Sequence, residues 1–148
     1  MQKLFFGLFF MCTCFWASGQ DLLTAAQLQA KKQDKLILLN FSGSDWCIPC
    51  IQLEKEYFKD SQFRRLADSQ LVVIRADFPR KKKNMPAAAI VKQNEQLADR
   101  FNKNGSFPLT ILLDANLRIV KTWDGRPEEE PAVFVRNLRN LLAHYKQP

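Results

Sequence analysis

Histidine is almost absent from this 148-residue sequence, where His144 is the single example, and cysteine occurs only four times. A closed zinc site needs four ligands, usually cysteine and histidine, so a chain with so few of them is not expected to build one. Covalent haem attachment through C-x-x-C needs a histidine directly after the second cysteine, and position 51 is Ile. We therefore expect no metal and no cofactor.

Long apolar runs are also absent, since a membrane-spanning helix needs about 20 residues. The N-terminal run, Leu4 to Trp16, has 13 residues, follows Lys3, and is followed by the small residues Ala17-Ser18-Gly19. This is the layout of a secretory signal peptide. We predict a signal peptide over residues 1–19 and one domain over residues 20–148, with an uncleaved membrane anchor as the alternative.

Cysteines that could form stabilising disulfide bonds are few as well. Removal of residues 1–19 would take Cys12 and Cys14 with it and leave one pair, Cys47 and Cys50. Small secreted domains that depend on disulfides carry more pairs, and the stabilisation by each grows with the loop that it closes. Redox chemistry explains a pair three positions apart better than stapling does, although a structural bridge remains the alternative.

Basic residues outnumber acidic ones, which gives a formal net charge of +7 that becomes +6 without Lys3. Nucleic acid would suit such a charge, but an exported protein rarely meets it, so we expect no nucleic-acid partner. The excess is concentrated in Arg80-Lys81-Lys82-Lys83. We interpret this run first as a solvated loop and second as a docking site for an acidic partner.

Apolar periodicity predicts helices and strands in the order α, β, α, β, α, β, β, α. Leu36–Phe41 is nearly all apolar, which is typical of a strand buried on both faces. The helix that follows it makes the next strand parallel, whereas the last two strands form a hairpin. The expected fold is a three-layer α/β/α domain with a central mixed sheet and a C-terminal antiparallel hairpin. The predicted helices are 22–32, 51–63, 88–102 and 127–145, and the predicted strands are 36–41, 71–77, 109–113 and 117–123.

The cysteine pair lies where the first strand passes into a helix. At a helix N-terminus, unpaired N–H groups and the helix dipole favour a thiolate, which makes Cys47 the candidate nucleophile. Cys50, one turn later, would attack Cys47 and release the reduced product. Pro49 has no N–H to leave unpaired there and holds the sulfurs in register. Trp46 would shield the disulfide and contact substrate, with ordinary half-buried packing as the alternative.

This arrangement resembles the thioredoxin fold over Leu36 to Tyr145, with residues 21–35 as the opening helix. Three features carry the resemblance: Trp46-Cys47-Ile48-Pro49-Cys50, Asp77 at the end of the second strand, and Phe107-Pro108 before the third. Phe41-Ser42-Gly43-Ser44-Asp45-Trp46-Cys47 followed by Leu53-Glu54-Lys55-Glu56 is most similar to exported bacterial disulfide reductases. These are relatives of the C-terminal domain of the periplasmic thiol:disulfide interchange protein.

The resemblance implies a cis Phe107–Pro108 peptide whose backbone pairs with an extended substrate segment. It also implies that Trp46, Ile48, Pro49, Phe107 and Pro108 bind substrate, and that the Ile48-Pro49 dipeptide favours a reductant. The expected partners are disulfide-bearing proteins and a membrane electron donor. The expected state is a periplasmic monomer.

The sequence also departs from the family. Many thioredoxins have a buried aspartate in the strand below the motif, and Asn40, which cannot be a general base, occupies that position. The lysine that often pairs with this aspartate is matched by Val73. Glu54, one turn after Cys50, is the candidate for proton transfer, with a solvated helix carboxylate as the alternative.

We therefore predict an exported thiol–disulfide oxidoreductase that reduces periplasmic proteins through Cys47 and Cys50. One alternative is a disulfide donor or isomerase, which runs the same chemistry in the other direction. The other is a non-catalytic module that uses the same fold to hold a peptide or a metal ion.

Overall fold

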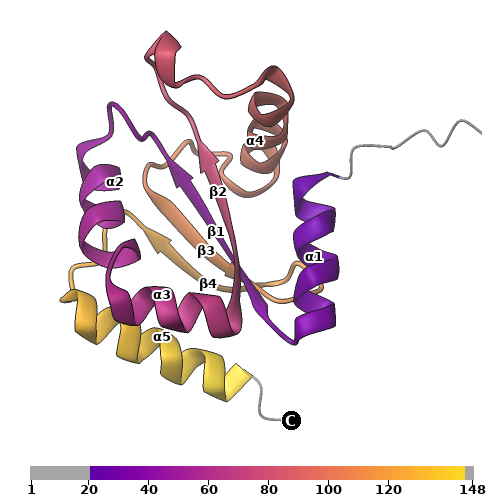
Figure 1. Cartoon of the computed structure of the whole chain (residues 1–148), viewed down its shortest axis with the longest axis vertical. Helices are drawn as coiled ribbons and strands as arrows, with labels where there is room; N and C mark the ends of the chain where they lie inside the picture. The colour runs from indigo at the N-terminus through magenta and orange to yellow at the C-terminus, as the bar shows by residue number, and fades with distance from the viewer. Residues whose placement is uncertain (1–20, 146–148) are drawn as a thin grey trace, which may run out of the picture.

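The computed structural model describes residues 21–145, so the predicted signal peptide lies outside the described residues. Four strands form one sheet in the order β2-β1-β3-β4 (Figure 1). They are β1 (Leu36–Ser42), β2 (Leu71–Asp77), β3 (Leu109–Leu113) and β4 (Ile119–Asp124). The β1–β2 pair is parallel, and the β1–β3 and β3–β4 pairs are antiparallel. The predicted mixed sheet with a C-terminal hairpin is confirmed.

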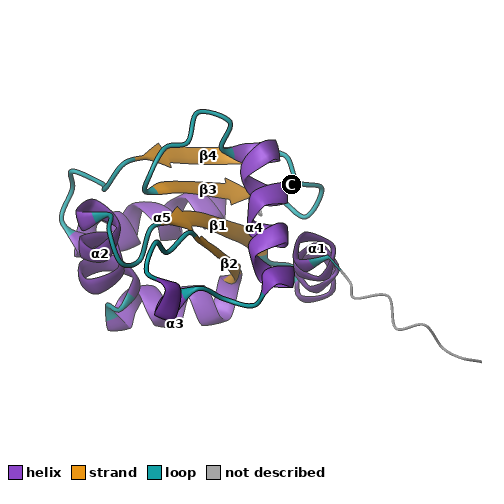
Figure 2. Cartoon of the chain, turned by 90° about the horizontal axis from the view of Figure 1, so that it is seen from above, coloured by secondary structure: helices purple, strands orange, loops and turns teal. Residues whose placement is uncertain are grey.

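Helices cover both faces of this sheet (Figure 2). One layer holds α2 (Ile48–Leu53), α3 (Ser61–Gln70) and α5 (Pro131–Tyr145), and the other holds α1 (Leu22–Gln33) and α4 (Ala88–Phe101). Side chains of β1 alternate between the two cores: Leu36 and Leu38 face the first layer, and Ile37, Leu39 and Phe41 face the second. Among residues 21–145, no helix is both long and apolar enough to cross a membrane.

The single helix predicted over residues 51–63 is wrong. The chain forms α2, then a π-helical turn at Glu54–Phe58, and then a separate helix, α3. Asp60 caps this new helix, because its Oδ1 accepts hydrogen bonds from two N–H groups of the first turn of α3 at 2.8 and 3.1 Å. Phe58 and Phe63 stack across the break with ring centroids 4.9 Å apart, so the apolar pattern continues where the helix does not.

The closing helix begins at Pro131 rather than at Pro127 as predicted. A proline inside a helix lacks the N–H donor, and its ring clashes with the carbonyl four residues earlier. A helix that started at residue 127 would place Pro131 in that position. At the first helical position the missing donor costs nothing. Glu130 lies just before the helix, and its C=O accepts hydrogen bonds from the N–H groups of Val133 and Phe134 at 2.9 Å.

Asp114 organises the turn between β3 and β4. Its Oδ1 accepts hydrogen bonds from the N–H groups of Asn116 and Arg118 at 2.8 and 2.9 Å. Leu117 takes a left-handed conformation with φ 64°, so β4 begins at Ile119 and not at residue 117 as predicted. The other oxygen, Oδ2, accepts hydrogen bonds from the Arg118 side chain and from the Tyr145 hydroxyl, which ties the end of α5 to the sheet.

Asp114 is expected to make stability depend on pH below about pH 4. Burial raises the pKa of its carboxyl, but hydrogen bonds from Arg118, Tyr145 and Asn116 outweigh burial and lower the pKa from 3.8 to about 2. A lowered pKa stabilises the fold above the unfolded-state value, and this stabilisation is lost as pH falls towards the folded-state value. Asp114→Asn should cost about 2 kcal/mol at pH 7, as the shift implies. Urea unfolding of both proteins should give a difference that shrinks between pH 4 and pH 2, and a constant difference would contradict this assignment.

Candidate functional site

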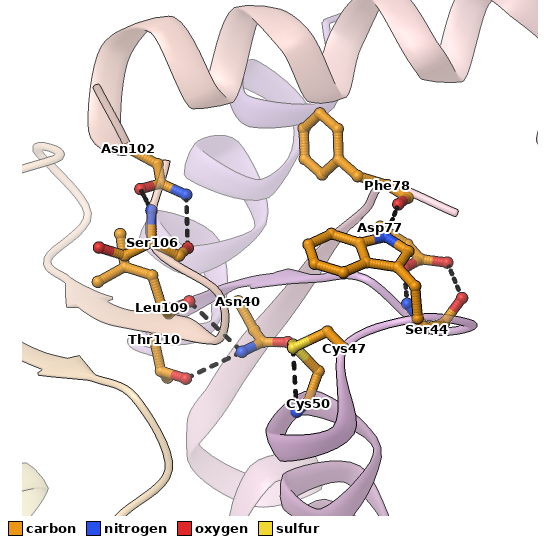
Figure 3. The surroundings of a disulfide bond; sticks show 11 residues. Asn40, Ser44, Cys47, Cys50, Asp77, Phe78, Asn102, Ser106, Leu109 and Thr110 are labelled. Atoms are coloured by element: carbon orange, nitrogen blue, oxygen red, sulfur yellow. Dashed lines mark hydrogen bonds between the residues drawn. A yellow bond between two sulfur atoms is a disulfide. The ribbon is translucent and has the colours of Figure 1, made fainter. Parts of the chain in front are cut away.

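Cys47 and Cys50 form a disulfide at the N-terminus of α2, with an S–S distance of 2.06 Å (Figure 3). Cys47 is the N-cap residue of this helix, and its Sγ accepts a hydrogen bond from the Cys50 N–H at 3.3 Å. The predicted position and pairing of the two cysteines are confirmed. An N–H aimed at Sγ from a helix N-terminus stabilises negative charge on that sulfur.

The two residues between the cysteines are the exposed part of the motif. Ile48 is 67% exposed and Pro49 is also exposed, whereas Cys47 and Cys50 are only 5% and 3% exposed. Pro49 lies in the first turn of α2, where a proline fits without losing a helical hydrogen bond. The disulfide is therefore recessed beside an exposed apolar dipeptide.

Trp46 is half-buried and held from several sides. Its Nε1 donates a hydrogen bond to the C=O of Phe78 at 2.7 Å, and its ring meets Phe107 edge-on at 5.4 Å between centroids. The Arg80 guanidinium lies over the same ring, 4.0 Å from its centroid. A Cβ on Gly43 would come within 2.3 Å of the indole, so only glycine leaves room for it. The Trp46 side chain is therefore packed against its neighbours while part of it remains exposed to solvent.

The peptide bond between Phe107 and Pro108 is cis, as predicted. Pro108 is buried and has no N–H, and its C=O accepts a hydrogen bond from the Gly125 N–H at 2.8 Å. The backbone of Pro108 therefore has no donor, and its acceptor is already engaged. The hydrogen bonds of residues 21–145 leave the N–H and C=O of Phe107 unpaired. Phe107 is the residue of this pair whose backbone can accept an additional strand.

A cavity of about 450 Å³ lies on the side of Cys50 that faces β1 and β2. Its wall includes Cys50, Asn40, Glu54 and Arg75. Asn40 is 4% exposed, and its Nδ2 donates hydrogen bonds to Thr110 Oγ1 at 2.9 Å and to the C=O of Leu109 at 3.4 Å (Figure 3). A neutral amide bound in this way cannot exchange a proton with a thiol.

Arg75, a cation with no role assigned from the sequence, lies at the cavity wall. The strand register places Val73, the residue matched with the family lysine, beside Leu38, and it places Arg75 beside Asn40. Arg75 forms a salt bridge with Glu54. A cation from β2 and a carboxylate from the π-helical turn therefore pair at this wall.

Two aspartates with no role assigned from the sequence fix the turn before Cys47. The Asp77 carboxylate accepts hydrogen bonds from the N–H and the hydroxyl of Ser44 at 2.8 and 2.6 Å (Figure 3). Asp45 accepts hydrogen bonds from the backbone N–H groups of Arg80 and Lys81, both at 2.9 Å. Each contact joins residues more than 30 positions apart, so no local pattern could indicate it.

The described residues do not meet the requirements of a metal site. In residues 21–145, no three Cys, His, Asp or Glu side chains gather in a way that could hold an ion.

Comparisons with known proteins give a consistent result. Residues 16–115 match the thioredoxin-like family. The disulfide bond reductase DsbH of Chlamydia pneumoniae is 35% identical over 114 residues, which cover 67% of each chain. A solved structure of a DsbH oxidoreductase aligns with a TM-score of 0.71 and 28% identity over 80% of this chain and 79% of that one. A thioredoxin from Thermus thermophilus aligns with a TM-score of 0.55 and 21% identity over 79% and 81% of the two chains.

Proposed function

Because the chain belongs to the thioredoxin-like family, we propose that it reduces disulfide bonds in other proteins by dithiol–disulfide exchange. The observation that carries this proposal is the Cys47–Cys50 pair at the N-terminus of α2, which follows Trp46 and brackets the exposed Ile48. The Trp46 ring contacts Phe107, whose backbone is unpaired. The reductase activity named for the 35%-identical relative supports the reducing direction.

The exchange runs in two steps. The Cys47 thiolate attacks one sulfur of the substrate disulfide, the substrate S–S bond breaks, and the departing sulfur leaves as a thiolate that takes up a proton. The Cys50 thiolate then attacks Cys47 Sγ, which releases the second substrate thiolate and closes the Cys47–Cys50 disulfide. Two electrons pass from the protein to the substrate, and a dithiol donor must return them before the next cycle.

Substrate would lie across the recess. The N–H and C=O of Phe107 can pair with an extended segment of the substrate, strand to strand. Trp46, Ile48 and Pro49 offer an apolar rim, the Trp46 ring contacts Phe107, and the next residue, Pro108, is buried. This arrangement presents a substrate sulfur to Cys47 and leaves Cys50 covered until the mixed disulfide has formed.

Glu54 is the proposed proton acceptor for Cys50. Both residues line the same cavity. Of the other polar residues there, Asn40 is a neutral amide, and the second carboxylate, Asp77, already accepts two hydrogen bonds. Arg75 holds the Glu54 side chain at the cavity wall through their salt bridge. A carboxylate in this position can take the thiol proton as Cys50 attacks, directly or through one water molecule.

Glu54→Gln should slow the second step by about 10²-fold at pH 7, the lower end for the loss of a general base. The deficit should shrink as pH approaches about 8.5, where a cysteine ionises without help. Rapid-mixing measurements of the decay of a preformed mixed disulfide from pH 6 to pH 9 give this profile. The matched control is Glu56→Gln, a carboxylate of the same turn that pairs with Arg126 away from the cavity. Equal slowing in both variants would remove Glu54 from the mechanism.

Export to the periplasm is part of the proposal, together with a membrane electron donor and a monomeric state. Support for export comes from the N-terminal sequence: one positive charge, a 13-residue apolar run and small residues before Gln20. The intact mass of the protein recovered from the periplasm would distinguish cleavage before Gln20 from an uncleaved anchor.

A redox titration tests the direction of the reaction. A potential near −270 mV, as for thioredoxin, is expected for a reductant, whereas a value near −120 mV would make the protein a disulfide donor. Reduction of insulin by the dithiol form should accompany the lower potential. A protein that pairs its cysteines reversibly but leaves insulin and small disulfides oxidised would be a binding module.

A further inference from the structure

The basic run of the sequence is fixed against the redox motif. The carboxylate of Asp45, two positions before Cys47, accepts hydrogen bonds from the N–H groups of Arg80 and Lys81 and from Asn84 Nδ2, each at 2.9 Å. These bonds lower the pKa of Asp45, so the carboxylate stays charged. The loops that contain Asp45 and Arg80 leave the sheet at the same edge, where β1 and β2 end (Figure 1).

The same loop presents uncompensated positive charge. Arg80, Lys81, Lys82 and Lys83 are all exposed, and no salt bridge joins them to a carboxylate in the described part of the chain. Asp45 is the carboxylate bound to the backbone of this loop, and counting its charge with the four cations leaves a formal charge of +3. A solvated loop would need neither the three hydrogen bonds to Asp45 nor the stacking of Arg80 on Trp46.

The distance between this charge and the substrate position is short. Arg80 lies 4.0 Å from the Trp46 ring, and that ring lies 5.4 Å from Phe107. The Arg80 guanidinium is therefore within roughly 10 Å of the centre of the Phe107 ring, the length of about three residues of extended chain. A substrate strand paired with the Phe107 backbone would bring residues a few positions from its cysteine near the basic loop.

We propose that the Arg80–Lys83 loop is a specificity surface for acidic residues within about three positions of the substrate cysteine. This inference rests on the proposed reductase function and names its substrate class: disulfides flanked by Asp or Glu. The positive loop attracts such a segment before the sulfurs meet and so raises the rate at which the mixed disulfide forms.

Two oxidised peptide homodimers test this proposal. They share one central cysteine and differ only in carrying glutamates or lysines at the second and third positions on each side. In single-turnover reactions with pre-reduced protein at low ionic strength, the glutamate peptide should react about tenfold faster. This ratio should fall towards one in 1 M salt, where charges are screened within about 3 Å. A ratio of one for the wild type at low salt overturns the proposal.

Two lysine pairs provide matched variants. Lys82→Glu/Lys83→Glu should bring the ratio to one or below. Lys31→Glu/Lys32→Glu changes the net charge by the same amount in the last turn of α1, outside the site, and should keep the wild-type ratio. Because the ratio compares two peptides on one protein, a general loss of activity cancels. Loss of the preference in both variants would assign it to net charge and overturn the proposal.

Asp45→Ala distinguishes the effect of the loop's position from the effect of its charge. This substitution makes the loop more positive but removes its anchor, so the ratio should fall if the position of the loop matters. A rise would show that charge alone acts, and would overturn the proposed geometry.

Two further results separate this proposal from its competitors. If the protein reduces hydroxyethyl disulfide but shows no preference between the peptides, the proposed specificity surface is wrong and the proposed reductase function stands. If it reduces neither hydroxyethyl disulfide nor the peptides, the proposed reductase function itself is wrong. Binding to phosphatidylglycerol vesicles that depends on Lys82 and Lys83, with no peptide preference, would make the loop a membrane-binding one.

Discussion

Cys47→Ser should reduce the rate of disulfide reduction to that of the uncatalysed exchange. Cys47 is the residue at the N-terminus of α2, between Trp46 and the exposed Ile48, whereas Cys50 lines the cavity on the side of β1 and β2. A hydroxyl at position 47 is not ionised at neutral pH and cannot form the mixed disulfide. Insulin reduction measured with wild type and variant gives the result, and equal activity would remove Cys47 from the mechanism.

Cys50→Ser should give the complementary outcome. The first step remains, so the variant should accumulate a covalent adduct between Cys47 and its substrate, which intact mass detects and a reductant releases. The adduct also identifies the physiological partner when it is isolated from the periplasm. The control for folding is the urea midpoint of each variant, which should equal that of wild type in its reduced form. Adduct formation through Cys50 in the Cys47→Ser protein would reverse the order of the two cysteines.

Phe134→Ala should cost about 3–5 kcal/mol of unfolding free energy, the usual range for a buried phenylalanine. Phe134 is 2% exposed and lies at the centre of an aromatic cluster under the motif helix. Its ring meets Tyr57 and Trp123 edge-on at 5.6 Å and stacks near Phe63 at 6.4 Å between centroids. Small domains have only about 5–15 kcal/mol of stability, so this one change removes a large part of it.

Urea unfolding at pH 7 measures this loss. Arg139→Ala, an exposed position on the same helix, should change stability by less than about 0.5 kcal/mol. Trp123 contacts Phe134 in the native state, so its fluorescence reports the same transition. A loss below about 1 kcal/mol for Phe134→Ala would show that neighbouring side chains refill the cavity, and would contradict the expected cost.

The differences between prediction and structure have local causes. The helix predicted over residues 51–63 failed because Phe58 and Phe63 continue the apolar pattern across a break that Asp60 caps. The start of α5 was misplaced because two prolines, at positions 127 and 131, each suit a first helical position. The sequence did not indicate that Arg75 lies beside Asn40, because the register of β1 and β2 is not visible in either strand alone.

The sequence by itself determined the fold class, the buried central strand, and Cys47 and Cys50 as the redox pair. These features depend on residue types at short spacing: alternation in a strand, periodicity in a helix, and two sulfurs one turn apart. Only the tertiary structure decided that Arg75 and Glu54 pair beside Cys50 and that Asp45 fixes the basic loop next to Trp46. Those contacts join residues 21 to 39 positions apart, and they form only after the sheet has aligned its strands.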